Sequence, residues 1–169
     1  MVKSFVAALV ALTVMLTSTA YADFSQIGQF GTPANNPSAE ETSAEIIAAT
    51  EDGMTLVYSD SPANVLGMID ITDPTNPLPL GSVDLGGEPT SVAIKNGNAY
   101  VGINTSSDFV EPSGHLVVID IQTQMEVARF DLGGQPDSVA VSPDGTFVAV
   151  AIENERNEDI NDEMIPQLP

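Results

Sequence analysis

The sequence contains no cysteine and no tryptophan, and aromatic residues make up only 5% of it. The absence of cysteine excludes disulfides, thiol nucleophiles and thiolate metal sites. Positive charge is also scarce, since four Lys and Arg residues stand against 24 Asp and Glu, for a formal net charge of −20. This charge disfavours binding to nucleic acid and to anionic lipid. It indicates either a solubilising surface or an affinity for cations and basic partners.

A long membrane-spanning run is lacking at the N-terminus as well. The apolar run from Phe5 to Leu16 is shorter than the roughly 18 residues needed to cross a bilayer. Lys3 precedes this run, and Ala20-Tyr21-Ala22 fits the small-x-small rule for signal cleavage. We therefore expect a signal peptide cleaved before Asp23, with a retained anchor as the alternative. The mature protein is then exported, periplasmic or extracellular, with no membrane span.

What the chain does contain is a repeat. The segment Leu132-Gly-Gly-Gln-Pro-Asp-Ser-Val-Ala-Val141 matches Leu85-Gly-Gly-Glu-Pro-Thr-Ser-Val-Ala-Ile94. Their offset falls within the roughly 20 to 50 residues typical of repeat arrays. Short β-branched runs alternate with turn signals such as Glu51-Asp52-Gly53, which is the pattern of antiparallel meanders. The sequence therefore predicts an all-β fold, a β-propeller of four-stranded antiparallel blades.

The strand pattern divides the chain into six parts. We expect a signal peptide at 1–22, a linker at 23–43, a first blade at 44–87, a second blade at 88–134, the first half of a third blade at 135–152, and an acidic loop at 153–169. Within the linker, Ile27-Gly-Gln-Phe30 is either an edge strand that closes the ring or part of an extended tail.

The number of blades predicts a truncated sequence. Closed propellers have about four to eight blades, and the pattern gives about two and a half, so we expect the natural protein to continue past Pro169. An independent small sandwich is the alternative, and its unpaired strand edges would favour aggregation.

Several motifs resemble known propeller repeats. Gly134–Val150, with Ser142-Pro-Asp-Gly145 between its strands, and the preceding Leu116–Val127 are similar to the YVTN-type repeat. Tyr100-Val-Gly-Ile-Asn104 resembles the Tyr-Val-Thr-Asn signature, from which Gly102 and the inserted Ile103 depart, and Met68–Pro77 resembles the LVIVD repeat. The resemblance covers about residues 44–152 and implies the propeller fold without a particular function.

A second resemblance concerns activity. Four segments together resemble the exported propellers described as having esterase-like activity of phytase: Ala44–Ile47, Asp70–Pro74, Gly86–Pro89 and Ile152–Arg156. This resemblance implies hydrolysis of phosphate esters or other esters. It identifies no catalytic residue.

Side chains for nucleophilic catalysis are few. His115 is the one histidine, and no Gly-x-Ser-x-Gly elbow occurs. One histidine without cysteine cannot form the usual zinc cage either. The sequence therefore shows no serine-hydrolase or zinc-hydrolase constellation.

The acidic segment is the candidate metal site. Calcium binds about six to eight oxygen ligands in flexible loops, and a solvated charge run is the alternative. Arg156 is the candidate phosphate-binding residue, unless it pairs with a neighbouring glutamate. The predicted calcium ligands are Glu153, Glu155, Glu158, Asp159, Asp162 and Glu163.

Two functions follow from the sequence. The first is an exported module that binds a small molecule, a glycan or an envelope protein, with calcium as a candidate cofactor. The alternative is a calcium-dependent phosphate-ester or carboxylic-ester hydrolase.

Overall fold

The computed structural model describes residues 24–108 and 110–155. In this part of the chain it contains ten strands, one short 3-10 turn, η1 (Thr32–Ala34), and no α-helix. The strands are β1 (Ala44–Ala49), β2 (Thr55–Asp60), β3 (Val65–Asp70), β4 (Leu78–Asp84), β5 (Glu88–Lys95), β6 (Asn98–Asn104), β7 (Gly114–Asp120), β8 (Met125–Asp131), β9 (Pro136–Val141) and β10 (Val148–Ile152).

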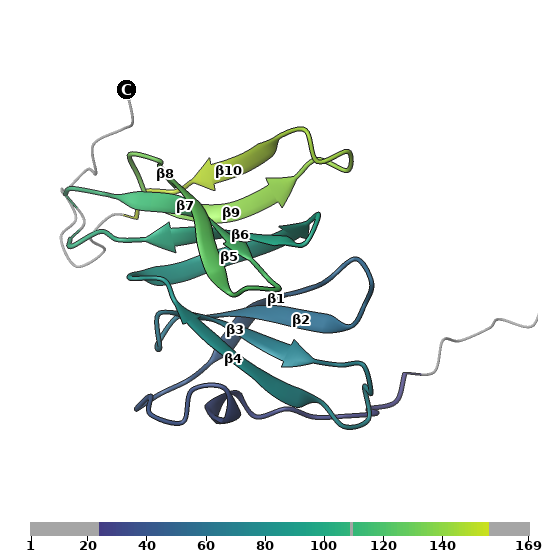
Figure 1. Ribbon diagram of the computed structural model, residues 1–169. Coiled ribbons are helices and arrows are strands. Elements are labelled where there is room, and N and C mark those ends of the chain that lie inside the picture. The colour runs from purple at the N-terminus through teal and green to yellow at the C-terminus, as the bar shows by residue number, and fades with distance from the viewer. Residues whose placement is uncertain (1–23, 109, 156–169) are drawn as a thin grey trace, which may run out of the picture.

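The strands form three separate antiparallel sheets (Figure 1). The first sheet has the order β1-β2-β3-β4, the second β5-β6-β7-β8, and the third pairs β9 with β10. Local turn chemistry explains the hairpins. Asn96 and Gly97, between β5 and β6, both have positive φ, at 51° and 74°, as a two-residue type I′ turn requires. The predicted all-β fold of four-stranded antiparallel sheets is confirmed, and the sheets form a partial propeller that does not close.

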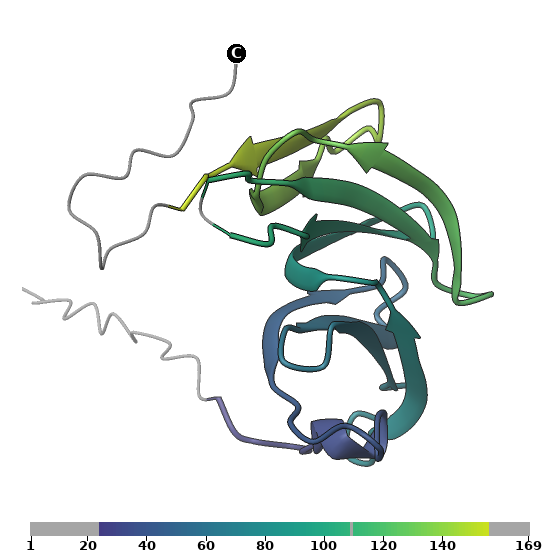
Figure 2. The same cartoon turned by 90° about the vertical axis from the view of Figure 1, so that its left-hand side faces the viewer.

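The sheets are stacked face to face, with the third sheet on the second and the second on the first (Figure 2). Strand β5 contacts β1 and β2 on one side and β9 on the other. The side chains that meet between the first two sheets form one core, because alternate residues of each strand point to the same face. Its buried members are Val57, Leu66, Met68, Leu85, Val92, Ala99, Val101, Ile103, Val117 and Ile119.

Residues 24–43 contain no strand in this partial propeller, and the pairing of Ile27–Phe30 with the far end of a closed ring stays a prediction. This segment is fixed to the first sheet by Asn35, which is only 8% exposed. The Asn35 amide Nδ2 donates to the Tyr58 hydroxyl at 3.0 Å and to the Met68 carbonyl at 2.8 Å. Its Oδ1 accepts from the backbone N–H of Gly81 at 2.9 Å. Gly81 has a φ of +95° at a bulge in β4, a conformation that favours glycine.

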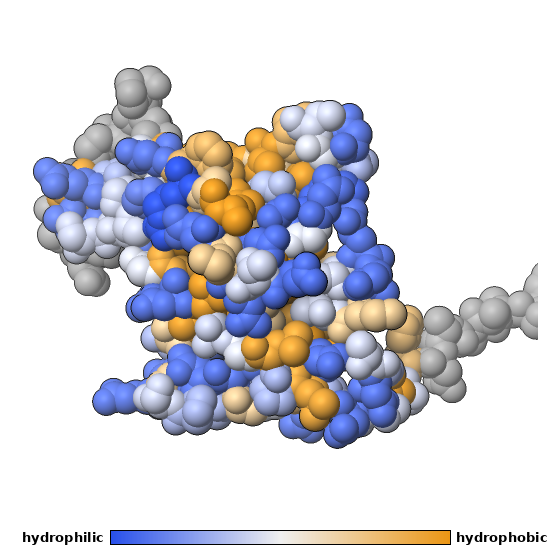
Figure 3. All heavy atoms as spheres, viewed as in Figure 1, coloured by the Kyte–Doolittle hydropathy of each residue, from blue (hydrophilic) through white to orange (hydrophobic). Residues whose placement is uncertain are grey.

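The outermost strands carry apolar side chains at the surface (Figure 3). Hydrophobic residues gather over β4 and β8 in this view, and the exposed ones are Leu78, Leu80, Met125, Val127 and Phe130. In the described part of the chain, no helix has the length and hydropathy needed to cross a membrane.

Candidate functional site

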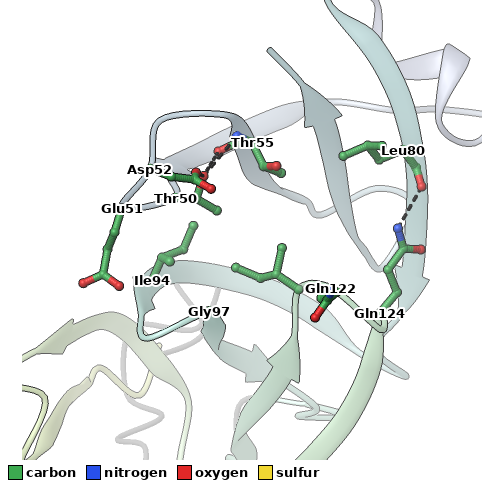
Figure 4. A pocket seen from close by; sticks show the side chains of 10 residues that line it. Thr50, Glu51, Asp52, Thr55, Leu80, Ile94, Gly97, Gln122 and Gln124 are labelled. Carbon is green, nitrogen blue, oxygen red and sulfur yellow. Dashed lines mark hydrogen bonds between the residues drawn. The ribbon is translucent and has the colours of Figure 1, made fainter. Parts of the chain in front are cut away.

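A groove with a volume of about 590 Å³ opens between the first and second sheets. It lies at the end of the sheets where the β1–β2, β5–β6 and β7–β8 turns come together (Figure 4). Turns from consecutive repeats therefore line one cavity. The lining residues are Thr50, Glu51, Asp52, Thr55, Leu80, Ile94, Gly97, Ile121, Gln122 and Gln124.

Asp52 provides a carboxylate at one wall of the groove. Its Oδ1 accepts hydrogen bonds from the Thr50 hydroxyl at 2.6 Å and from the Met54 N–H at 3.0 Å. The Thr50 hydroxyl, followed by the Met54 N–H, lowers the pKa of Asp52 below its ordinary value. Asp52 is therefore ionised at neutral pH, and its Oδ2 has no hydrogen-bond partner among the described residues.

Glu51 precedes Asp52 in the same turn, but its carboxylate bonds to the second sheet. One carboxylate oxygen lies 2.5 Å from the Lys95 ammonium, and the other accepts from the Asn96 N–H at 3.0 Å. The hydrogen bond from Lys95, with that from Asn96, lowers the pKa of Glu51. Its carboxylate is turned toward the β5–β6 turn, so Glu51 ties the two sheets together and its charge is compensated.

The opposite wall and the floor are mostly apolar. Leu80 and Ile94 project into the groove (Figure 4), and Ile121 also lines it. Gln124 Nε2 donates to the Leu80 carbonyl at 2.9 Å. This bond uses a donor of Gln124 and leaves its Oε1 as an acceptor.

A second polar contact links β8 of the second sheet to Leu85, the residue after β4 of the first sheet. The Arg129 guanidinium contacts Glu126 at 2.7 Å and donates to the Leu85 carbonyl at 3.2 Å. Its hydrogen bond lowers the pKa of Glu126. Both described Lys and Arg side chains, Lys95 and Arg129, are thus paired at this junction.

Two of the predicted calcium ligands lie in the described chain. Backbone N–H groups of Glu153 and Glu155 donate to the backbone and side-chain carbonyl oxygens of Gln135 at 2.9 and 2.6 Å. Gln135 N–H in turn donates to Asn154 Oδ1 at 3.0 Å. The start of the acidic segment is therefore held against the loop before β9, and both glutamate side chains are exposed.

The other predicted site residues, Arg156, Glu158, Asp159, Asp162 and Glu163, lie outside the described residues. Within residues 24–108 and 110–155, no three acidic or histidine side chains are grouped to hold a metal ion. The calcium site stays a prediction.

Sequence reasoning missed the groove. It identified Glu51-Asp52-Gly53 as a turn, which is correct, but did not place this turn beside Leu80 and Gln124 of other hairpins. A signal was present, because hairpin turns at equivalent repeat positions lie at the same end of stacked sheets.

Comparison with known proteins gives a family and a fold. The family described as Choice-of-anchor I domain matches residues 45–167. The chain matches none of the curated proteins. The YVTN and LVIVD repeat types remain a resemblance.

Solved structures resemble the chain at the level of the fold. Hydrazine synthase from Kuenenia stuttgartiensis is 21% identical with a TM-score of 0.55, over 79% of this chain and 33% of that one. A luciferin-regenerating enzyme is 20% identical with a TM-score of 0.54, over 71% of this chain and 40% of that one. The chain thus spans 33% and 40% of the lengths of these two structures.

Proposed function

Since the chain belongs to the choice-of-anchor I domain family, we propose that it is an exported β-propeller module that binds a ligand or partner at the cell envelope. The family supports a surface or exported module, and the similar solved structures support the propeller fold. Ligand binding and the place of the site go beyond that identification.

The observation that carries the proposal is the groove between the first two sheets. It combines an apolar floor with a few polar groups, which is the usual composition of ligand sites. Hydrogen bonds of Glu51 and Gln124 across the junction fix its walls, so the cavity is already formed without a ligand.

Sedimentation with envelopes tests the proposal. The mature chain is mixed with washed envelope fragments from the source cells, and the pelleted fraction is measured with and without the Leu80→Asp substitution. We expect the wild type to pellet and Leu80→Asp to remain in solution. Leu78→Asp is the matched control, since Leu78 is 49% exposed on the same strand and lies outside the groove. Equal pelleting of both variants, or none of the wild type, would contradict the proposal.

A calcium-dependent ester hydrolase is the second candidate. The observation in its favour is the fixed start of the acidic segment, where Gln135 holds the backbone of Glu153 and Glu155. Exposed carboxylates are suitable calcium ligands, and Arg156 would bind a phosphate ester through its planar guanidinium. Bound calcium would polarise a phosphoryl oxygen.

Thermal unfolding and ester assays test this candidate. Calcium should raise the melting temperature and a chelator should lower it, and the shift should shrink in Glu155→Gln and Asp159→Asn. Hydrolysis of p-nitrophenyl phosphate or p-nitrophenyl acetate should follow the same dependence. A calcium shift without hydrolysis would indicate calcium-assisted binding, and no shift would refute the calcium site.

A further inference from the structure

We propose that the groove between the first and second sheets binds an alkylammonium group, either on a free aliphatic polyamine or at the end of a lysine side chain. This inference rests on the proposed binding function and names the chemistry of the ligand. It follows from the inventory of donors, acceptors and apolar groups in the groove.

Two acceptor atoms remain available among the polar groups of the groove. The Thr50 hydroxyl donates to Asp52 and accepts from the Thr55 N–H at 3.0 Å. Gln124 Nε2 donates to the Leu80 carbonyl. These bonds leave Asp52 Oδ2 and Gln124 Oε1 without a protein partner among the described residues, and Asp52 is exposed, so a ligand would replace water there. The Gln122 carboxamide and the Thr55 hydroxyl can each donate or accept a hydrogen bond. A ligand that satisfies the two acceptors has to supply N–H or O–H donors.

Among ligands that supply such donors, the charge of the groove favours a cation. Lys95, the basic residue beside the groove, is paired with Glu51, so the Asp52 carboxylate is left as the uncompensated charge. Asp52 is held ionised by the Thr50 hydroxyl and the Met54 N–H, both of which donate to its Oδ1. The net charge of −20 raises the local concentration of cations at the surface. An anionic ligand would meet this field without a free basic partner.

The apolar floor defines the rest of the ligand. Leu80, Ile94 and Ile121 offer aliphatic surface, and no aromatic side chain lines the groove within the described part of the chain. Sugars and aromatic rings gain much of their affinity from stacking on aromatic residues, whereas a chain of methylene groups packs well on aliphatic side chains. The lining therefore fits an aliphatic stem that ends in an ammonium group.

Calorimetric titration of the mature chain with 1,5-diaminopentane, at neutral pH and physiological salt, tests the inference. We expect saturable binding that weakens about tenfold or more in Asp52→Asn, because a hydrogen bond to a charged group is lost. Asp144→Asn is the matched control. Asp144 accepts from Ser142 and Thr146 in the corresponding turn of the third sheet and does not line the groove. Circular dichroism checks that each variant is folded.

Three outcomes would overturn the inference. The first is an absence of saturable binding of 1,5-diaminopentane. The second is equal weakening by Asp52→Asn and Asp144→Asn, which would indicate attraction by net charge alone. The third is binding of 1-pentanol as tight as that of the diamine. A short peptide with one lysine, compared with its Nε-acetylated form, distinguishes the two sources of the amine. Tighter binding of the unmodified peptide than of the diamine points to a lysine of a partner protein, and the reverse points to a free polyamine.

The two proposals fail in different ways. Envelope pelleting that persists without amine binding would refute the alkylammonium ligand and leave the binding function intact. Amine binding without envelope pelleting would refute the envelope function and leave the ligand chemistry intact.

Discussion

The two junctions between consecutive sheets are built differently. Between the first and second sheets, long side chains reach across: Lys95 to Glu51, Gln124 to Leu80, and Arg129 to Leu85. Between the second and third sheets, small residues allow close approach. A Cβ on Gly114 would meet Pro136 and the carbonyl oxygens of Gly134 and Ile103. The groove lies at the junction that these long side chains bridge.

The largest expected effect is at the close-packed junction. Gly114→Ala places a methyl group against two backbone carbonyl oxygens and Pro136, none of which is a flexible side chain. We expect it to lower the free energy of unfolding by about 3 kcal/mol, measured by urea denaturation. Gly31→Ala is the control, because the nearest atom to its Cβ is 3.9 Å away. If both variants were equally stable, the second junction would not be tightly packed.

A smaller loss is expected in the core of the first junction. Val101 is fully buried among residues of both sheets, so Val101→Ala removes two methyl groups and leaves a cavity. The free energy of unfolding should fall by about 2 kcal/mol. Val127→Ala, at a position that is 58% exposed, should change it by less than about 0.5 kcal/mol. A comparable loss in both variants would place the core elsewhere.

Equivalent turn positions of the two junctions should respond unequally. Gln135 is 5% exposed, and its side chain accepts from the Glu155 N–H at 2.6 Å. Glu88 holds the same place in the repeat, is exposed, and makes no side-chain hydrogen bond among the described residues. Gln135→Ala should cost about 1 kcal/mol, and Glu88→Ala should be nearly neutral. The reverse order in chemical denaturation would refute the asymmetry.

The smallest expected effect is the response of the first junction to acid. The pKa of Glu51 is lowered in the folded state by Lys95 and Asn96, so its contribution to stability is present above the ordinary glutamate pKa of about 4.3. That contribution is lost as pH falls through the lowered folded-state pKa. Glu51→Gln should therefore flatten the decline of melting temperature in acid. Glu88→Gln is the control, because Glu88 makes no such contacts within the described chain. If both substitutions changed the acid decline of the melting temperature equally, the Glu51 contacts would not be its cause.

Local chemistry predicted most of the fold. Alternating apolar runs and turn pairs such as Asn96-Gly97 define hairpins from neighbouring residues alone. The match between Gly86 and Gly133 gave the repeat, and repeats of this kind have to stack to bury their faces. These features needed no knowledge of distant contacts.

The groove and the N-terminal contact could not be predicted in the same way. Asp52 of the first sheet and Gln124 of the second line the same groove only after the two sheets have stacked. Asn35 lies in a segment of linker-like composition, yet its carboxamide bonds to three strands. Both features depend on how separate strands are placed relative to one another, and the hydrophobic periodicity of a single sequence does not contain this information.

The contacts of Asn35 also have a mechanical consequence. The segment before Asn35 also lies against the first sheet, because a Cβ on Gly28 would meet Pro74 and Pro77. Tension applied to this segment therefore reaches the sheet at several points, and Asn35 is one of them. There the force divides among Tyr58 of β2, Met68 of β3 and Gly81 of β4. Several hydrogen bonds have to break together before β1 can be peeled away. One asparagine thus serves as a tether that spreads tension over the sheet.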